Sequence, residues 1–356
     1  MLLWILSLAI AACVELSVGM LLLHGWRARR RRARAEAIGE LSMAFARHVT
    51  GRLSAVELRA KIAAVPDDAF WQTLENYADT VSGDEWARIA NVVSRIPNVH
   101  HEVRRLRHRA PWRRALAVRH LGMLSVAAPV ERLREAMAGG PMIVTLTAAL
   151  ALARLRDRAA LRWLLAHPAA TERQDRRILT AVLKRFGPEF VPELRDALRP
   201  GSPETRIGIA TIEVLGIFGD RGSREPLEAI LRGGAVESRT SAARALGAIR
   251  LPEALPALLA ALSDPDWPVR AQAARSLGAL ELDGAVETLA EAACDASWWV
   301  RRNVAYALAR LGARGLDQLL RVSQLSSDRY AREMSVEVLQ MLEWERRSRG
   351  GISRVE

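Results

Sequence analysis

The chain has 356 residues, of which 50% are hydrophobic and only 5% aromatic, and its formal net charge is +12. This composition favours many short helices over sheets. A length that would ordinarily indicate about two domains sets no such limit on a repeat solenoid. The two cysteines are placed too differently to pair with each other, since Cys13 lies in an apolar stretch and Cys294 among repeats, which agrees with a reducing compartment.

The chain begins with an apolar run, residues 2–25, that carries a single charge, Glu15. About 20 such residues span a bilayer as one helix. A cleaved signal peptide would carry its positive charge before a shorter apolar core. The series Ile10 to Cys13 resembles a lipoprotein processing site, but it too lacks the basic leader. We therefore predict that residues 1–26 are an uncleaved transmembrane signal anchor.

Six arginines follow the apolar run directly, and nothing before it is basic. The positive-inside rule then places the N-terminus outside and the rest of the chain in the cytoplasm, anchored in the inner (cytoplasmic) membrane. The basic juxtamembrane segment 27–36 is expected to contact anionic lipid through Arg27–Arg34. Glu15 lies near the middle of the span, where a charge costs about 2.5 to 3.5 kcal/mol on insertion scales. Its carboxyl group either contacts another membrane helix or is protonated and uncharged within the bilayer.

Residues 37–109 form a helical N-terminal cap region that shows no repeat column. A solenoid needs atypical ends, because an exposed apolar face would aggregate, and residues 85–95 are interpreted as a degenerate copy. The breaks at Gly51, Pro66 and Gly83 divide the region into helices. These helices are predicted over residues 36–48, 54–65, 67–79 and 84–96.

Arginines gather between residues 104 and 119, and no acidic residue opposes them there. A basic groove attracts phosphate, so one hypothesis is a nucleic-acid partner. The other is that these side chains cover solvated helix faces near an anionic membrane, and it is favoured because no base-reading module is recognisable. The candidate basic patch consists of Arg104, Arg105, Arg107, Arg109 and Arg113.

Leucines recur at intervals of 31 or 32 residues through the rest of the chain. Nearly equal intervals indicate a repeat protein, because each copy of a solenoid places the same side chain at the same position. In the clearest copy, residues 270–280 and 285–293 carry small and apolar residues at helical spacing, so each copy is predicted to be an antiparallel helical pair. We assign residues 110–347 to the repeats and 348–356 to a disordered tail. The column is Leu121, Leu152, Leu183, Leu215, Leu246, Leu277, Leu308 and Leu339, followed about twelve residues later by Leu133, Leu164, Leu194, Leu227, Leu258, Leu289 and Leu320.

An arginine stands seven residues before the column leucine in six of the eight copies. Leucine packing does not require a charge at a fixed place, so each arginine is expected to meet a carboxylate across an inter-repeat turn, where Asp264 and Asp295 are suitably placed. A ligand-facing arginine row is the alternative, and the structural ladder is favoured. The predicted ladder consists of Arg114, Arg176, Arg239, Arg270, Arg301, Arg332, Asp264 and Asp295.

The runs Asp264 to Arg270 and Trp298 to Arg301, each followed by an alanine-rich helix that ends in Leu-Gly or Leu-Ala, resemble bacterial HEAT repeats. They are most similar to the HEAT-like repeats first named for phycobilin lyases. The resemblance is strong over residues 236–340 and weaker over 140–235, where Thr145 and Gly208 replace the arginine. It implies an all-α, right-handed α-α superhelix that binds other macromolecules, and it does not imply lyase activity.

Aromatic side chains gather in the inter-repeat turns, nine or ten residues before the column leucine. Rings at this place either pack in the seam between repeats or form a stacked row that anchors a partner. The packed arrangement is favoured, with Trp298 and Trp299 as the pair expected to leave one ring exposed. The candidate partner-binding residues are Trp267, Trp298, Trp299 and Tyr330.

No motif supports catalysis, a metal or a cofactor: His100-His101-Glu102 lacks the helical spacing of a zinc site, and no phosphate-cradling glycine loop is present. We predict a membrane-anchored cytoplasmic scaffold or adaptor whose concave second-helix face binds a protein partner, such as a membrane enzyme or a signalling component. The alternatives are a membrane-tethered nucleic-acid binder and, third, a lyase-type enzyme.

Overall fold

The computed structural model describes residues 2–352 except 82, 125–127 and 199–203, with the side chains of residues 2–18, 79, 346 and 349–352 left out. Every element in these residues is a helix, which agrees with the predicted all-α class. The chain divides into two units, Met1–Leu155 (unit 1) and Arg156–Glu356 (unit 2). The first copy of the repeat and the first helix of the second copy therefore belong to unit 1, together with the cap region.

Unit 1 holds the first eight α-helices, and the predicted helices of the cap region are all present. The capping box of Ser54 and Glu57 starts α2, because the Ser54 side chain accepts from the Glu57 N–H while the Glu57 carboxylate accepts from the Ser54 N–H. The helices are α1 (Leu2–Val49), α2 (Ala55–Ala63), α3 (Asp67–Thr80), α4 (Gly83–Val93), α5 (Pro97–Arg105), α6 (Pro111–Gly122), α7 (Val130–Ala138) and α8 (Met142–Arg154).

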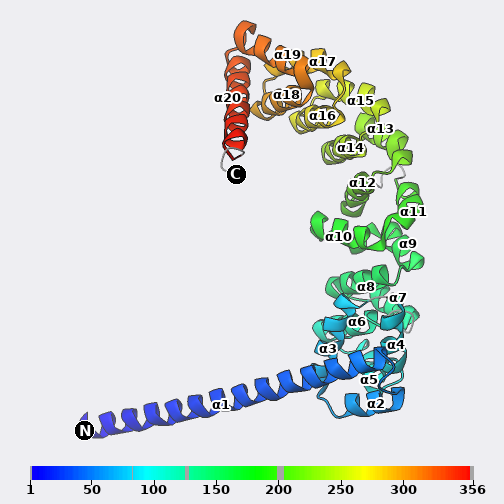
Figure 1. Ribbon diagram of the computed structural model, residues 1–356, viewed down its shortest axis with the longest axis vertical. Helices are drawn as coiled ribbons and strands as arrows, with labels where there is room; N and C mark the ends of the chain where they lie inside the picture. The colour runs from blue at the N-terminus through cyan, green and yellow to red at the C-terminus, as the bar shows by residue number, and fades with distance from the viewer. Residues whose placement is uncertain (1, 82, 125–127, 199–203, 353–356) are drawn as a thin grey trace. The chain divides into compact units, whose positions relative to one another are not determined.

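Helix α1 joins the expected membrane segment, the basic segment and the helix predicted over residues 36–48 into one element (Figure 1). Its second half packs through buried Leu41 and Phe45 against α2, α3 and α4. Residues 20–36 are exposed. Most of the expected span 2–25 lies outside the residues with described side chains, as do Glu15 and Cys13. Within the described part of the chain, no helix combines the length and apolar character that crossing a membrane requires.

Unit 2 repeats a first helix and a second helix, and several second helices begin or end in a 3-10 turn. The first helices are α10 (Arg176–Phe186), α12 (Arg206–Phe218), α14 (Val236–Ile249), α16 (Trp267–Leu280), α18 (Trp298–Arg310) and α20 (Arg329–Ile352). The second helices are α9 (Arg158–Ala166), α11 (Val191–Asp196), α13 (Arg224–Gly233), α15 (Leu255–Ala260), α17 (Val286–Glu291) and α19 (Gly312–Leu325). Helix α20 extends past residue 347, where the repeats were expected to end.

First helices approach each other closely where a glycine follows the column leucine, at Gly122, Gly216, Gly247 and Gly278. A Cβ added to Gly216 would lie 2.8 Å from the backbone of Ala245, and one on Gly278 would lie 2.7 Å from the backbone of Ala307. Gly122 meets Ala151 in the same way within unit 1. The second helices make fewer contacts with one another. The first helices therefore form the inner row of unit 2 (Figure 1), which corrects the expectation of a concave second-helix face.

In unit 2, a residue with positive φ stands four residues after the column leucine of each first helix from α10 to α18, at or just past the end of that helix. Glycine adopts this conformation freely, whereas residues with a Cβ are strained there. Two copies nevertheless use a charged residue, Arg250 with φ 57° and Glu281 with φ 56°. The others are Gly187, Gly219 and Gly312.

The column leucines form the seam of the core as expected, and those from Leu121 to Leu308 are at most 1% exposed. The second column is buried at Leu133, Leu194 and Leu289 but fails at the last copy, where Leu320 is 45% exposed and Leu319 is buried instead. Leu319 stands eleven residues after the column leucine Leu308, as buried Leu194 stands eleven residues after Leu183, whereas the other copies use a spacing of twelve.

Candidate functional site

Two of the predicted ladder arginines meet an aspartate 25 residues further along the chain. Arg239 donates from Nε to Asp264 Oδ2 over 2.8 Å and from Nη2 to Oδ1 over 2.9 Å. Arg270 donates to Asp295 over 2.6 and 3.0 Å in the same bidentate geometry. Burial raises the pKa of Asp295, but the hydrogen bond and charge of Arg270 outweigh it and hold that pKa below its ordinary value.

The ladder guanidinium groups also tie down their own inter-repeat turns. Arg270 Nη1 donates to the Asp264 carbonyl over 2.8 Å, and Arg301 Nη1 donates to the Asp295 carbonyl over 2.6 Å. Arg332 binds the Ser326 carbonyl over 2.6 Å. Position 25 after Arg301 is serine, so this arginine binds carbonyls alone, and its guanidinium lies 5.2 Å from the Tyr330 ring centre.

Arg176 belongs to a different network, on the surface of the first helices. Its Nε lies 3.1 Å from Glu213 Oε1, and its Nη1 lies 2.8 Å from Glu237 Oε1. Glu213 also accepts from the Thr180 hydroxyl and lies 3.1 Å from Arg244 Nη1. The network links α10, α12 and α14 along the stretch where the sequence resemblance is weak and Gly208 replaces the ladder arginine.

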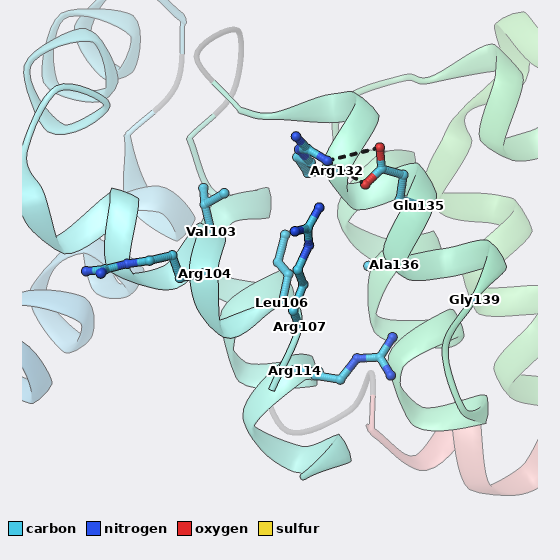
Figure 2. A pocket seen from close by; sticks show the side chains of 9 residues that line it. All are labelled: Val103, Arg104, Leu106, Arg107, Arg114, Arg132, Glu135, Ala136 and Gly139. Atoms are coloured by element: carbon cyan, nitrogen blue, oxygen red, sulfur yellow. Dashed lines mark hydrogen bonds and ion pairs between the residues drawn. The ribbon is translucent and has the colours of Figure 1, made fainter. Parts of the chain in front are cut away.

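The structure places Arg114 at the rim of a hollow of about 410 Å³ in unit 1 (Figure 2). Its Nε has no accessible surface and no hydrogen-bond partner among the described residues. Gly139 lies in the same lining, 25 residues after Arg114, where the later copies carry the ladder aspartate. The lining consists of Val103, Arg104, Leu106, Arg107, Arg114, Arg132, Glu135, Ala136 and Gly139.

The candidate basic patch does not form one continuous surface. Arg105 donates to buried Glu102 over 2.6 Å, and Arg113 stacks its guanidinium on Trp112 at 5.0 Å. Arg104 and Arg107 line the hollow beside Arg114, whereas Arg109 is exposed outside it. The patch therefore divides into a neutralised part, an exposed part and a part that faces the hollow.

The candidate aromatic residues form a row across three repeats at the N-terminal ends of α16, α18 and α20. The Trp267 and Trp299 rings stack with centres 6.5 Å apart, and Trp298 meets Trp299 edge to face at 4.7 Å. Tyr330 is 60% exposed, and the three tryptophans are 45–51% exposed. The rings thus pack on one another and still present about half of their surface, whereas the packed arrangement favoured from sequence leaves one ring exposed. We call these four residues the aromatic row.

The basic segment after the expected anchor lies on the exposed part of α1. Arg34 Nε lies 3.2 Å from Asp68 Oδ2, and the Arg30 guanidinium lies 4.9 Å from the Trp26 ring centre. The remaining arginines between Arg27 and Arg32 are exposed and form no ion pair with the described residues. Such a surface is chemically able to meet anionic headgroups.

A buried polar cluster in unit 1 was not anticipated. Glu102 is 1% exposed, and its Oε1 lies 3.3 Å from His120 Nδ1 as well as 2.6 Å from Arg105 Nη1. The His120 ring stacks on Trp71 at 4.2 Å. Burial raises the pKa of Glu102, but His120 and Arg105 outweigh it and lower that pKa. The cluster holds α5 against α6 and α3. His100 and His101, in contrast, are exposed, as expected.

Metal ligands do not gather in the part of the chain that the structure describes: it holds no group of three or more His, Cys, Asp or Glu side chains that could bind an ion. The described surface presents half-exposed aromatic rings and guanidinium groups that form no ion pair with the described residues.

Sequence comparison identifies the repeats of unit 2. Residues 191–277, 225–293 and 255–340 match the family model described as HEAT repeats. These segments cover the copies that carry the bidentate arginine pairs and the aromatic row, so residues 191–340 are similar to HEAT repeats, in agreement with the resemblance noted above. A search of curated proteins found no match.

Solved structures with a similar helical arrangement include a Kap121p mutant, with 12% identity and a TM-score of 0.47 over 80% of this chain and 38% of that chain. Human deoxyhypusine hydroxylase in complex with glycerol matches with 17% identity and a TM-score of 0.32 over 79% of this chain and 98% of that chain. An engineered protein matches with 19% identity and a TM-score of 0.36 over 80% and 83% of the two chains. The chain thus spans about two fifths of the first of these structures. At these TM-scores, the likenesses carry no argument about function.

Proposed function

We propose that this protein is a scaffold that is anchored in the inner membrane by residues 2–25 and binds a protein partner at the aromatic row of its HEAT repeats. Binding, and not turnover, is the proposed activity. The observation that carries the proposal is the row itself, in which Trp267, Trp298 and Trp299 each leave about half of a large ring in solvent. Contiguous exposed aromatic surface of this kind is typical of protein interaction sites.

Rigidity of the underlying repeats supports the same function. Arg270 and Asp295 fix the turn that carries Trp298 and Trp299, so the rings are presented without a large loss of side-chain freedom on binding. The anchor adds a second contribution, because tethering at the membrane raises the local concentration of a membrane enzyme or signalling component near the row. The arrangement has the N-terminus outside and the repeats in the cytoplasm.

Nucleic-acid binding through the candidate basic patch is the second hypothesis, and a lyase-type enzyme the third. The former is weaker because Arg105 is neutralised by Glu102 and Arg113 is engaged with Trp112, which leaves no continuous basic track for a phosphate backbone.

The test is co-purification of the tagged, detergent-solubilised protein, with and without nuclease, followed by mass spectrometry. The double substitution Trp298→Ala and Trp299→Ala is expected to remove a partner that the wild type retains in both arms. Trp112→Ala is the matched control, because Trp112 is also an exposed turn aromatic, at 60%, but lies in unit 1. A partner that survives the double substitution would contradict the proposed site, and a partner lost only with nuclease would favour the nucleic-acid hypothesis.

Anchoring is tested separately by membrane fractionation. Full-length protein is expected in the membrane pellet after alkaline carbonate extraction, and a variant lacking residues 2–25 in the supernatant. Full-length protein that is released by carbonate would contradict the anchor without bearing on the aromatic row.

A further inference from the structure

Arg114 occupies the position at which later copies of the repeat place an arginine with a bidentate carboxylate partner. In those copies the partner stands 25 residues further on, as Asp264 does after Arg239 and Asp295 after Arg270. The corresponding residue after Arg114 is Gly139, which has no side chain to offer. The first copy therefore keeps the cation of the ladder and lacks its anion.

The hollow of about 410 Å³ lies where that anion is missing. Figure 2 shows Arg107 and Arg114 extending toward the space beside α7, with Arg104 pointing away from it. Arg132 is already neutralised, because it donates to Glu135 over 2.9 and 3.2 Å.

The remaining lining arginines carry uncompensated charge. Within the described residues, Arg104, Arg107 and Arg114 form no ion pair, and the Nε of Arg114 is a buried donor without an acceptor. Because the Nε has no accessible surface, an acceptor that enters the hollow meets the terminal nitrogens of the Arg114 guanidinium, where it gains charge-assisted hydrogen bonds.

We propose that this hollow binds a carboxylate presented by an acidic peptide segment, which takes the place of the missing ladder aspartate. A carboxylate is favoured because the fork of an arginine matches it bidentately, as Arg270 and Asp295 show in the equivalent place. Val103, Leu106 and Ala136 give the hollow an apolar wall that suits the aliphatic part of an acidic side chain and its neighbours. The inference rests on the proposed function only in that the segment belongs to a protein partner.

The glycine itself provides a specific test. Gly139 has φ −102° and ψ 10°, which any residue adopts, and a Cβ there would meet only the Glu135 carbonyl, at 3.4 Å. The substitution Gly139→Asp should therefore fold and supply the missing carboxylate from within the chain. It keeps every arginine of the hollow, so it separates occupation of the site from loss of positive charge.

The experiment measures fluorescence anisotropy of a fluorescein-labelled peptide of alternating Glu and Leu added to the full-length, detergent-solubilised protein. Arg114→Ala and Gly139→Asp are each expected to weaken binding about tenfold or more, because each removes a charge-assisted hydrogen bond from the complex. Arg109→Ala, which removes one exposed charge outside the hollow, should change the affinity by less than about twofold. The same peptide with Gln for Glu should not bind.

Several results would overturn the proposal. They are equal weakening by Arg109→Ala and Arg114→Ala, unchanged binding in Gly139→Asp, binding of the Gln peptide, or stronger competition by inorganic phosphate or by a single-stranded oligonucleotide than by the unlabelled Glu peptide. Because the probe is synthetic, the result is independent of the aromatic row: Trp298→Ala with Trp299→Ala should leave peptide binding intact even where it removes the partner.

Discussion

The ladder repeats of unit 2 and the first repeat of unit 1 place an arginine at the same position and use it differently. In unit 2, Arg239 and Arg270 form ion pairs with Asp264 and Asp295, and their guanidinium groups link successive inter-repeat turns. In unit 1, Arg114 faces a hollow beside Gly139. The arginine alone therefore does not define a bidentate ladder. Where aspartate stands 25 positions later, the cation is paired within the solenoid, and at Arg114, where Gly139 stands there, it forms no ion pair with the described residues.

The largest expected effect tests what the two regions share. Leu121 and Leu277 are both fully buried in the seam. Replacing either with alanine should therefore lower the free energy of unfolding by about 2 to 5 kcal/mol. Leu320→Ala is the control, since its side chain is 45% exposed and its loss should cost about 0.5 kcal/mol. Urea unfolding followed by circular dichroism measures all three. A small loss of stability for Leu121→Ala beside a large loss for Leu277→Ala would show that the two regions do not share the same packing.

The close approach of first helices is the second shared feature. Gly122→Ala and Gly278→Ala each insert a Cβ against the next first helix, at Ala151 and Ala307, so each should destabilise by about 1 to 3 kcal/mol. Gly233→Ala, where nothing lies within 4 Å, should be neutral or slightly stabilising. Thermal unfolding of the three variants checks this order, and a neutral Gly278→Ala would show that the helices can move apart freely.

The third prediction concerns the arginine–aspartate pair, which unit 2 contains and the first repeat of unit 1 lacks. Asp295→Asn leaves Arg270 without its carboxylate and should cost about 1 to 3 kcal/mol at neutral pH. Because the pKa of Asp295 is held below its ordinary value of 3.8, its contribution is complete above that pH and is lost as the pH falls through the lowered pKa. The wild type should therefore lose stability relative to Asp295→Asn on acidification. A constant difference between the two proteins down to strongly acidic pH would show that the pair contributes nothing.

The smallest expected effect is an increase in the free energy of unfolding. Glu281 ends its first helix at φ 56°, where Gly312 stands in the next copy. Glu281→Gly should stabilise the protein by up to about 1 kcal/mol by relieving the left-handed strain. Differential scanning calorimetry would detect the rise in midpoint, and a fall would indicate that the Glu281 side chain makes a favourable contact that outweighs the strain.

The repeat architecture was readable from the sequence because periodicity survives substitution: eight leucines at nearly constant spacing predict stacked helical pairs without any knowledge of contacts. The same regularity placed Arg239 and Arg270 opposite Asp264 and Asp295. It failed at Leu320, where the buried side chain, Leu319, stands one residue earlier than the regular spacing predicts. It also did not show which helices line the inner row, since that depends on Gly216 and Gly278 meeting the next helix in space.

The candidate sites were less accessible to sequence reasoning. The aromatic row was found, but half exposure of stacked rings follows from geometry that no spacing encodes. Asking which residue stands 25 positions after each ladder arginine marks Arg114, which has Gly139 there, but it marks Arg176 and Arg301 equally, so the spacing alone does not locate the hollow. Glu102, His120 and Trp71 could not, since they come from three helices and share no motif.

The most direct test of the role assigned to the residue 25 positions after the arginine is a double-mutant cycle of Gly139→Asp and Arg114→Ala, measured as free energies of unfolding. If the carboxylate closes the ladder, Gly139→Asp stabilises the protein only when Arg114 is present, and the coupling energy is about 1 kcal/mol or more. Additive effects of the two substitutions would contradict the account, because the introduced aspartate would then not meet the arginine for which its position predicts it.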